Sequence, residues 1–153
     1  MIHNDVLRSV RYMLNLRDQN LVEIAALADV EVPLDIMKEY LKSDDDPDFR
    51  LCPDDIMAAF LDGLIFFRRG KDPARAPLPA EFPITNNTVL KKLRVAFELK
   101  EHDILNLLRQ AGFEVAAPEL SAFFRRKGHP NYRECGDQYL RNFLKGLAQR
   151  LQK

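Results

Sequence analysis

The sequence has little cysteine, no uninterrupted long apolar run and no excess of one charge, and each absence excludes a class of protein. Two cysteines among 153 residues are too few for a disulfide-rich scaffold and favour reduced thiols. Charged residues break the apolar stretches, as Asp62 breaks Met57–Phe67, so we expect no membrane-spanning helix. The opening Met-Ile-His-Asn-Asp has neither the basic region nor the apolar run of a secretory signal. We therefore expect a cytoplasmic protein forming one compact domain or two small half-domains.

Motifs for catalysis and cofactor binding are also missing. The sequence has no glycine-rich phosphate loop, no Gly-x-Ser-x-Gly and no His-Glu-x-x-His. Its three histidines and two cysteines lack zinc-ligand spacing, and Asp44–Asp48 lacks the glycine and distal glutamate of a calcium loop. We interpret His129, between a glycine and a proline, as a turn residue. We therefore expect no metal site, no cofactor and no enzymatic activity.

The chain does contain an internal repeat. Residues 4–64 align without a gap on residues 87–147, at an offset of 83 positions and with 16 identical pairs. The segment between the copies carries four prolines, which favour an extended connector, and its residues Leu78, Phe82 and Ile84 predict that it lies along a surface. The predicted division is a first repeat at 1–70, a proline-rich linker at 71–86 and a second repeat at 87–153.

Each repeat predicts four helices, because its apolar residues recur with the 3.6-residue period of an amphipathic helix. Only Val30–Val32 alternates like a strand, and this segment is too short to predict a β-strand. We therefore predict an all-α fold of two tandem four-helix repeats with a pseudo-two-fold relation. The expected helix starts are Asn4 and Asn87, as N-caps, for the first helix, Pro33 and Pro118 for the third, and about Pro53 and Gly136 for the fourth.

A glycine occupies the same position inside the fourth helix of both repeats, at Gly63 and Gly146. Glycine inside a helix costs about 1 kcal/mol relative to alanine, so its presence in both copies indicates that another backbone comes close. We predict that this helix crosses a neighbour there, with its own counterpart in the other repeat as one candidate. The alternative is a weak helix position that both copies tolerate.

The loop before the fourth helix repeats the pattern Pro-x-[Phe/Tyr]-Arg-x-Cys-x-Asp. We expect each cysteine at the helix N-cap, where the positive end of the helix dipole lowers a thiol pKa. The arginines would act in the same direction, and the first-turn aspartates would oppose it. The structural alternative is a small capping cysteine and an arginine that ties the loop to the acidic turn. The residues are Pro47, Arg50, Cys52 and Asp54, and Pro130, Arg133, Cys135 and Asp137.

The two repeats have opposite charge although the chain is neutral. Residues 4–70 contain 8 basic and 14 acidic side chains, whereas residues 87–153 contain 13 basic and 7 acidic ones. The difference is sharpest where Lys42–Asp46 aligns with Arg125–His129. Basic residues there suit a helix C-terminus, and the acidic ones suit a solvated loop, so both also have purely structural explanations. The candidate polyanion- or partner-binding residues are Lys91, Lys92, Arg94, Arg125, Arg126, Lys127, Arg133 and Arg141.

Three stretches carry a resemblance to a known family. They are the doubled Asn-x-Val-Leu-[Arg/Lys]-x-[Val/Leu]-Arg that starts each repeat, and Leu120–Asp137 and Leu140–Leu147 in the second copy. With them the chain resembles the YehS-like family of small bacterial two-repeat proteins over nearly its whole length. The resemblance implies a helical bacterial cytoplasmic protein and supplies neither an activity nor a catalytic residue.

Three functional hypotheses follow. The first, which we favour, is a non-catalytic interaction or scaffold protein that binds an unidentified protein or associates with itself through its oppositely charged halves. The second is nucleic-acid binding by the basic repeat, where Leu107–Arg126 resembles a helix-turn-helix with Gly112 at its turn but a longer connection than usual. The third is a thiol chemistry at Cys52 and Cys135.

Overall fold

The computed structural model describes residues 1–75, 77–79 and 81–152, and it confirms an all-α fold of two tandem repeats. Eight α-helices and one short 3₁₀ turn form its regular structure, and these residues include no strand. None of the helices in this part of the chain is long and apolar enough to cross a membrane. The elements are α1 (His3–Met13), α2 (Asp18–Leu27), α3 (Leu34–Tyr40), α4 (Asp54–Arg69), η1 (Pro73–Arg75), α5 (Asn86–Ala96), α6 (Glu101–Gln110), α7 (Ala117–Phe123) and α8 (Asp137–Leu151).

The second repeat follows the first at the same offset of 83 residues. The ends of α1, α2 and α3 correspond residue for residue to those of α5, α6 and α7, and α4 and α8 start at matching positions. The turns match as well: Asn15 and Glu98 both have a positive φ, of 53° and 52°. Asp29 and Gly112 share the next such turn, with φ of 63° and 83°. The two repeats therefore keep one backbone path even where their residue types differ.

The expected starts of the third and fourth helices agree closely with the structure. Pro53 and Gly136 are the N-caps of α4 and α8, and Pro33 is the N-cap of α3. Pro118 lies inside the first turn of α7, because that helix begins one residue earlier. The segment Val30–Val32 is extended without forming a strand.

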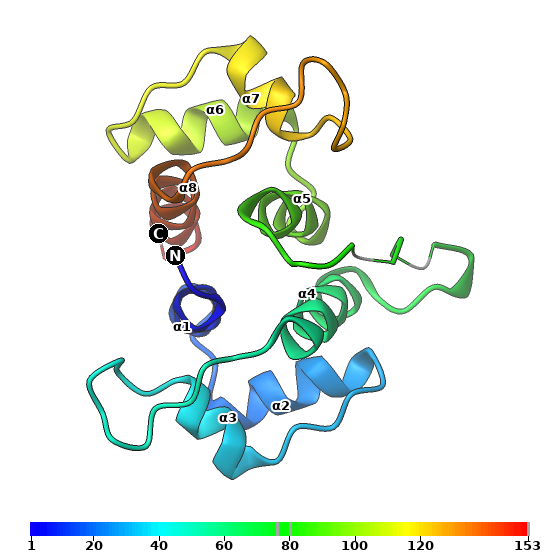
Figure 1. Cartoon of the computed structure of the whole chain (residues 1–153), viewed down its shortest axis with the longest axis vertical. Helices are drawn as coiled ribbons and strands as arrows, with labels where there is room; N and C mark the ends of the chain where they lie inside the picture. Colours follow the sequence, from blue (N-terminus) through cyan, green and yellow to red (C-terminus); the bar gives the residue numbers. More distant parts are fainter. Residues whose placement is uncertain (76, 80, 153) are drawn as a thin grey trace.

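Four helices form the centre of the molecule, and the other four lie outside them (Figure 1). The central helices are α1, α4, α5 and α8, with α2 and α3 on one side of them and α6 and α7 on the other. A pseudo-two-fold axis relates α1 to α5 and α4 to α8. The repeats therefore meet along two related seams, α1 against α8 and α4 against α5.

The two helix glycines mark close crossings within each repeat. A Cβ added at Gly63 would lie 2.7 Å from the carbonyl carbon of Ile24 in α2, and one added at Gly146 would lie 2.8 Å from that of Leu107 in α6. The predicted backbone approach is therefore present at both positions. The suggestion that the fourth helices cross each other is wrong, because each crosses the second helix of its own repeat.

The linker packs through one of the three residues expected to anchor it. Ile84 is 7% exposed and belongs to the core, whereas Leu78 and Phe82 are 75% and 60% exposed.

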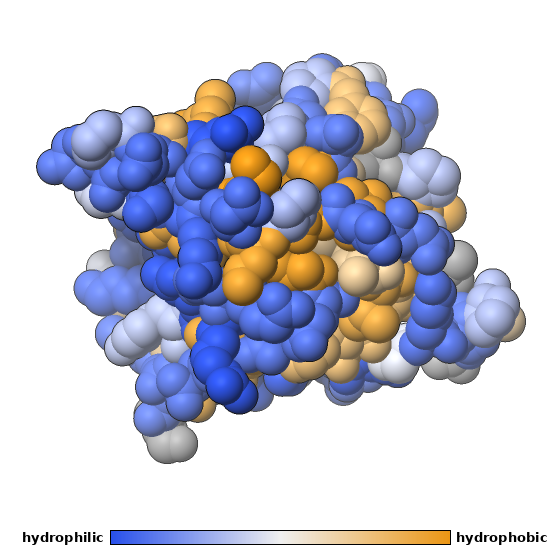
Figure 2. Space-filling view, turned by 90° about the horizontal axis from the view of Figure 1, so that it is seen from below, coloured by the Kyte–Doolittle hydropathy of each residue, from blue (hydrophilic) through white to orange (hydrophobic). Residues whose placement is uncertain are grey.

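The outer face of the first repeat, seen from below in Figure 2, also shows apolar side chains between hydrophilic ones. Leu34 in α3 is the most exposed large hydrophobic residue of the outer pair α2 and α3.

Candidate functional site

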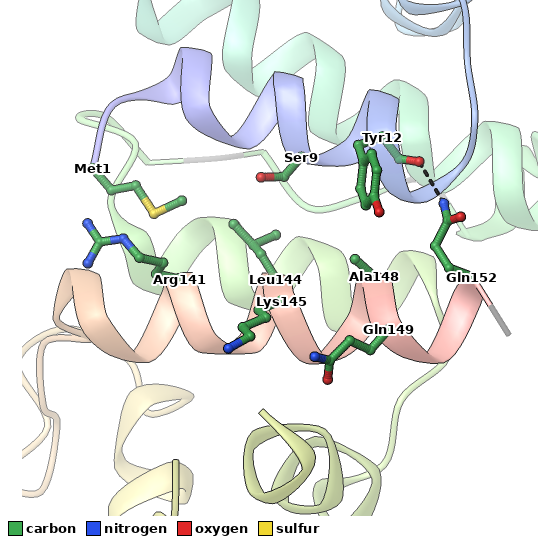
Figure 3. Close-up of a pocket in the computed structure, with 9 residues that line it drawn as sticks. All are labelled: Met1, Ser9, Tyr12, Arg141, Leu144, Lys145, Ala148, Gln149 and Gln152. Carbon is green, nitrogen blue, oxygen red and sulfur yellow. Dashed lines mark hydrogen bonds between the residues drawn. The ribbon is translucent and has the colours of Figure 1, made fainter. Parts of the chain in front are cut away.

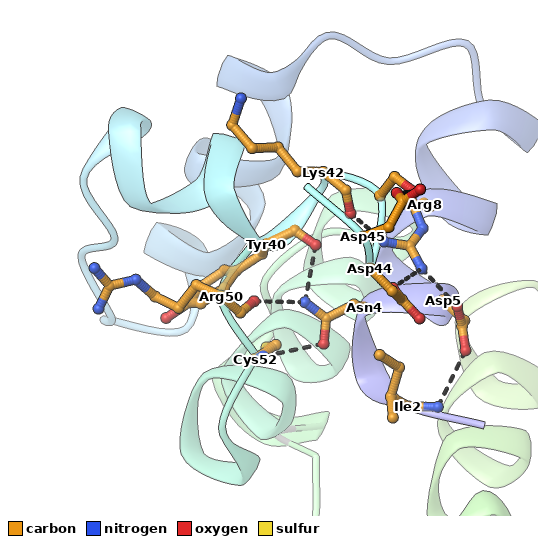
Figure 4. Close-up of polar contacts among 11 residues, drawn as sticks. Ile2, Asn4, Asp5, Arg8, Tyr40, Lys42, Asp44, Asp45, Arg50 and Cys52 are labelled. Carbon is orange, nitrogen blue, oxygen red and sulfur yellow. Dashed lines mark hydrogen bonds and ion pairs between the residues drawn. The ribbon is translucent and has the colours of Figure 1, made fainter. Parts of the chain in front are cut away.

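Asn4 and Asn87 are structural bridges and not helix caps. They are the second residues of α1 and α5, whose N-caps, Ile2 and Thr85, lie two residues before the predicted ones. The Asn4 amide donates to the backbone oxygens of Tyr40 and Arg50, at 2.9 and 2.8 Å, and its oxygen accepts from the amide of Cys52 at 3.0 Å (Figure 4). Asn87 makes the same three bonds to the matching residues of its repeat. Each asparagine therefore holds the loop of the repeated motif against the first helix.

The cysteines of that motif are buried. Cys52 and Cys135 lie one residue before the N-caps of α4 and α8 and are 3% and 5% exposed. Burial, and to a smaller extent the nearby aspartates, raises the pKa of each thiol to about 12; these aspartates are Asp55 and Asp54 beside Cys52 and Asp137 beside Cys135. Desolvation thus opposes the lowering of the thiol pKa by a helix N-terminus and agrees with the structural alternative, although the cysteines are not the N-caps that we predicted.

The other motif residues lie on the surface beside these buried thiols. Arg50 donates to the Glu39 carboxylate at 2.8 Å, whereas Arg133 is exposed and has no ion pair within the described residues. Pro47 and Pro130 are exposed in the loop. Asp54 and Asp137 start the fourth helices, and each holds a residue of a first helix: His3 lies 2.6 Å from Asp54, and Asn86 donates to Asp137 at 2.8 Å. These residues fasten the loop and form no reactive cluster.

The acidic loop after α3 is bound to α1. Arg8 contacts Asp5 at 2.6 Å and Asp44 at 3.3 Å, and it donates to the backbone oxygen of Lys42 at 2.6 Å (Figure 4). The repeat offset pairs Arg8 with Lys91 and Asp44 with Lys127, both exposed and cationic. An attraction in the first repeat is thus replaced by like charges in the second.

The structure divides the eight basic candidates into three groups. Lys92 and Arg94 are structural: Lys92 is 9% exposed, and Arg94 donates to the oxygen of Leu99 and lies 4.6 Å from the centre of the Phe124 ring. Arg141 lies over the α1–α8 seam. The remaining candidates are exposed on α5 and on the loop after α7, and the described residues offer them no ion pair. They are Lys91, Arg125, Arg126, Lys127 and Arg133.

A groove of about 510 Å³ runs along the α1–α8 seam (Figure 3). Buried Leu144 and half-buried Ala148 of α8 form its floor, and the 66%-exposed Tyr12 of α1 lies beside it. A second hollow, of about 490 Å³, adjoins it and adds Asp5 and Arg8. The residues that line the groove are Met1, Ser9, Tyr12, Arg141, Leu144, Lys145, Ala148, Gln149 and Gln152.

Contacts between the repeats close both ends of this groove. The ammonium of Met1 binds Asp137 at one end, and this contact, with the Asn86 bond, holds the pKa of that carboxyl below its usual range. At the other end the Gln152 amide donates to the backbone oxygen of Tyr12 at 2.9 Å (Figure 3). The groove therefore lies between two contacts that join the repeats, Met1–Asp137 and Gln152–Tyr12.

The pseudo-equivalent α4–α5 seam is filled by a buried ion pair. Lys92 of α5 contacts Asp62 of α4 at 2.7 Å and also donates to the backbone oxygen of Leu78 in the linker at 2.9 Å. At the offset of 83, Lys92 corresponds to Ser9 and Asp62 to Lys145. The short Ser9 side chain leaves open the space that Lys92 fills, and Lys145 has no acidic partner among the described residues.

We did not predict the groove from the sequence. Its signal lay in two of the non-identical pairs of the repeat alignment, Ser9 with Lys92 and Asp62 with Lys145. Among the described residues, no three histidine, cysteine or acidic side chains gather as a metal site would require.

Comparisons with known proteins agree with the duplicated fold. The family described as "Protein of unknown function (DUF1456)" matches the chain over residues 3–70 and again over residues 86–152. The chain is also 49% identical over 150 residues to "Uncharacterized protein YehS" of Escherichia coli (strain K12). The aligned region covers 98% of this chain and 96% of that protein. No solved structure matches significantly. The resemblance based on the sequence motifs is confirmed.

Proposed function

Because the chain belongs to the DUF1456 family, which is described as of unknown function, its function has to be argued from its own geometry, and we propose a non-catalytic protein-interaction module. The observation that carries the proposal is the open α1–α8 groove. It combines an apolar floor at Leu144 and Ala148 with unpaired cationic groups at Arg141 and Lys145. Such a combination is typical of sites that bind a side chain and fix its orientation through a few polar contacts.

The absence of enzymatic activity and a cytoplasmic location are part of the proposal. The nucleophiles that the sequence offered, Cys52 and Cys135, are buried with a raised pKa, which supports a non-catalytic role. Both are free thiols, as expected in a reducing compartment.

The test compares three tagged forms of the protein, each used to isolate partners from the native host and analysed by quantitative mass spectrometry. The first is the wild type, and the second is Ser9→Lys/Lys145→Asp, which rebuilds the Lys92–Asp62 pair at the equivalent positions of the groove. The third is Lys38→Glu, a matched control on the exposed surface of α3. The proposal expects a partner that wild type and control retain and the filled variant loses about tenfold. A set of proteins that does not differ among the three forms would contradict it.

Polyanion binding by the second repeat is the alternative, and one observation favours it. Lys91 and Lys127 are exposed and carry like charges where the first repeat has the Arg8–Asp44 pair, so a phosphate could supply the missing negative charge. A helix-turn-helix mode has less support. The seven-residue α7 carries Glu119 in its first turn, and six residues separate it from α6.

Gel-shift assays with duplex and single-stranded DNA and RNA at low and moderate salt test this alternative. It expects a salt-sensitive shift that Arg125/Arg126/Lys127→Ala removes and Lys145→Asp leaves unchanged. No shift at low salt would eliminate it.

A further inference from the structure

We infer that the α1–α8 groove binds an extended acidic peptide segment of a partner, lying along the seam as this chain's own linker lies beside the α4–α5 seam. The inference rests on the proposed function and adds the chemistry and the conformation of the ligand. It follows from the pseudo-two-fold axis, which makes one seam a reference for the other.

The α4–α5 seam shows how such a seam holds a chain. The Lys92 ammonium binds two oxygens at once, the Asp62 carboxylate at 2.7 Å and the backbone oxygen of Leu78 at 2.9 Å. Leu78 lies in the linker, outside any helix or strand. A buried lysine at this seam therefore binds one carboxylate and one backbone oxygen of a linker residue.

The α1–α8 seam keeps the lysine and lacks both oxygens. Lys145 takes the position of Asp62, so the cation comes from the fourth helix instead of the first. Ser9 is too short to cross the seam, and the residues that line the groove come only from α1, α8 and the chain ends beside them (Figure 3). A carboxylate and a backbone carbonyl supplied by another chain would satisfy Lys145 as Asp62 and Leu78 satisfy Lys92.

The charges around the groove favour an acidic ligand over a basic one. Arg141 and Lys145 both line it and form no ion pair within the described residues. The acidic groups nearby are already bound, since Asp5 pairs with Arg8 and Asp137 pairs with the Met1 ammonium. Asp137 also interacts electrostatically with Arg141, so Lys145 is the cation of the groove that has no acidic partner within the described residues.

The dimensions fit a short peptide. The groove extends from Met1 to Tyr12 on one side and from Arg141 to Gln152 on the other, which is about 17 Å at 1.5 Å per helical residue. An extended chain rises about 3.3 Å per residue, so about five residues span the site. Its apolar floor at Leu144 and Ala148 accepts an aliphatic side chain between the acidic ones.

Fluorescence anisotropy with labelled seven-residue peptides tests the inference. Each peptide has a central leucine flanked by aspartate and glutamate, by asparagine and glutamine, or by lysine. The inference expects wild type to bind the acidic peptides about tenfold more tightly than the neutral ones and the basic ones least. Lys145→Glu should reverse this order, and Ser9→Lys/Lys145→Asp should abolish binding. The control Lys38→Glu should bind as wild type does.

Each outcome decides a separate point. Equal affinity for acidic and neutral peptides, or the same loss in Lys38→Glu as in Lys145→Glu, would overturn the inference. Lys145→Glu changes an exposed side chain and keeps the test valid if the double variant fails to fold. If host proteins depend on the groove while no acidic peptide binds, the ligand class is wrong and the proposed function stands. If no host protein depends on the groove, the proposed function itself fails.

Discussion

Ser9 of α1 and Lys92 of α5 occupy the same position in the two repeats, and they give the two seams of the molecule different properties. Lys92 fills its seam and contacts Asp62 at 2.7 Å. Ser9 fills little of its seam, and the space beside it is a groove of about 510 Å³. The duplication has therefore produced one seam that an ion pair fills and one that leaves a groove.

Asn4→Ala should destabilise the protein by about 3 kcal/mol. The change leaves the oxygens of Tyr40 and Arg50 and the amide of Cys52 without their partner, and Asn4 is fully buried. Asn87→Ala should cost less, because Asn87 is only half-buried and water can reach the groups it leaves. Urea denaturation measures both, with Asn106→Ala on the exposed face of α6 as the control. Equal stability of Asn4→Ala and wild type would contradict the bridging role.

Gly63→Ala and Gly146→Ala should both lower the melting temperature. The added methyl group would press on the backbone of α2 or α6, whose carbonyl carbons would lie 2.7 and 2.8 Å away. This overlap should outweigh the gain of about 1 kcal/mol that alanine brings to a helix interior. Thermal denaturation followed by circular dichroism measures the shift. A higher melting temperature for both variants would show that the helices do not cross at these residues.

The thiols should remain unreactive in the folded protein up to strongly alkaline pH. The pKa of each is about 12, compared with an ordinary value of 9.0. The unfolded chain loses these protons first as the pH rises, so stability should fall between about pH 9 and 12. Titration with a thiol reagent in native buffer and in urea separates the states. Rapid labelling of the native protein at pH 8 would contradict the buried arrangement.

Replacing one partner of the Lys92–Asp62 pair should destabilise the α4–α5 seam. Lys92→Met leaves the Asp62 carboxylate without its cation, at a cost of about 2 kcal/mol, because Asp62 retains some exposure to water. The double variant Lys92→Met/Asp62→Leu should recover part of the loss, since no unpaired charge remains. A double-mutant cycle from denaturation curves measures the coupling between the two residues. Additive effects would mean that the pair does not act as a unit.

The all-α class and the repeat were predictable because they depend on patterns that many residues share. Sixteen identities at one offset are enough to align the repeats, and the 3.6-residue period places the helices within a residue or two. Gly63 could be assigned to a crossing because glycine inside a helix needs a reason. Its partner, Ile24, could not, since the tertiary arrangement alone determines which helix lies opposite.

The site was less predictable, because burial is a property of the fold. Lys92 counts as a surface cation in the sequence, yet the α4–α5 seam encloses it. Cys52 lies near a helix N-terminus, as the sequence indicates, and yet desolvation determines its pKa. The groove required two facts together, namely that α1 lies against α8 and that Ser9 and Lys145 replace the Lys92–Asp62 pair there.

Photo-crosslinking in the native host tests the groove as a docking site most directly. A benzophenone amino acid replaces Tyr12 beside the groove or, as the matched control, Phe67 on α4; these residues are 66% and 48% exposed. If the groove is a docking site, we expect a discrete adduct with a partner protein from position 12 and none from position 67. The adduct from position 12 should be lost when Ser9→Lys/Lys145→Asp is added. The absence of an adduct at position 12, or an adduct that persists in the filled variant, would contradict it.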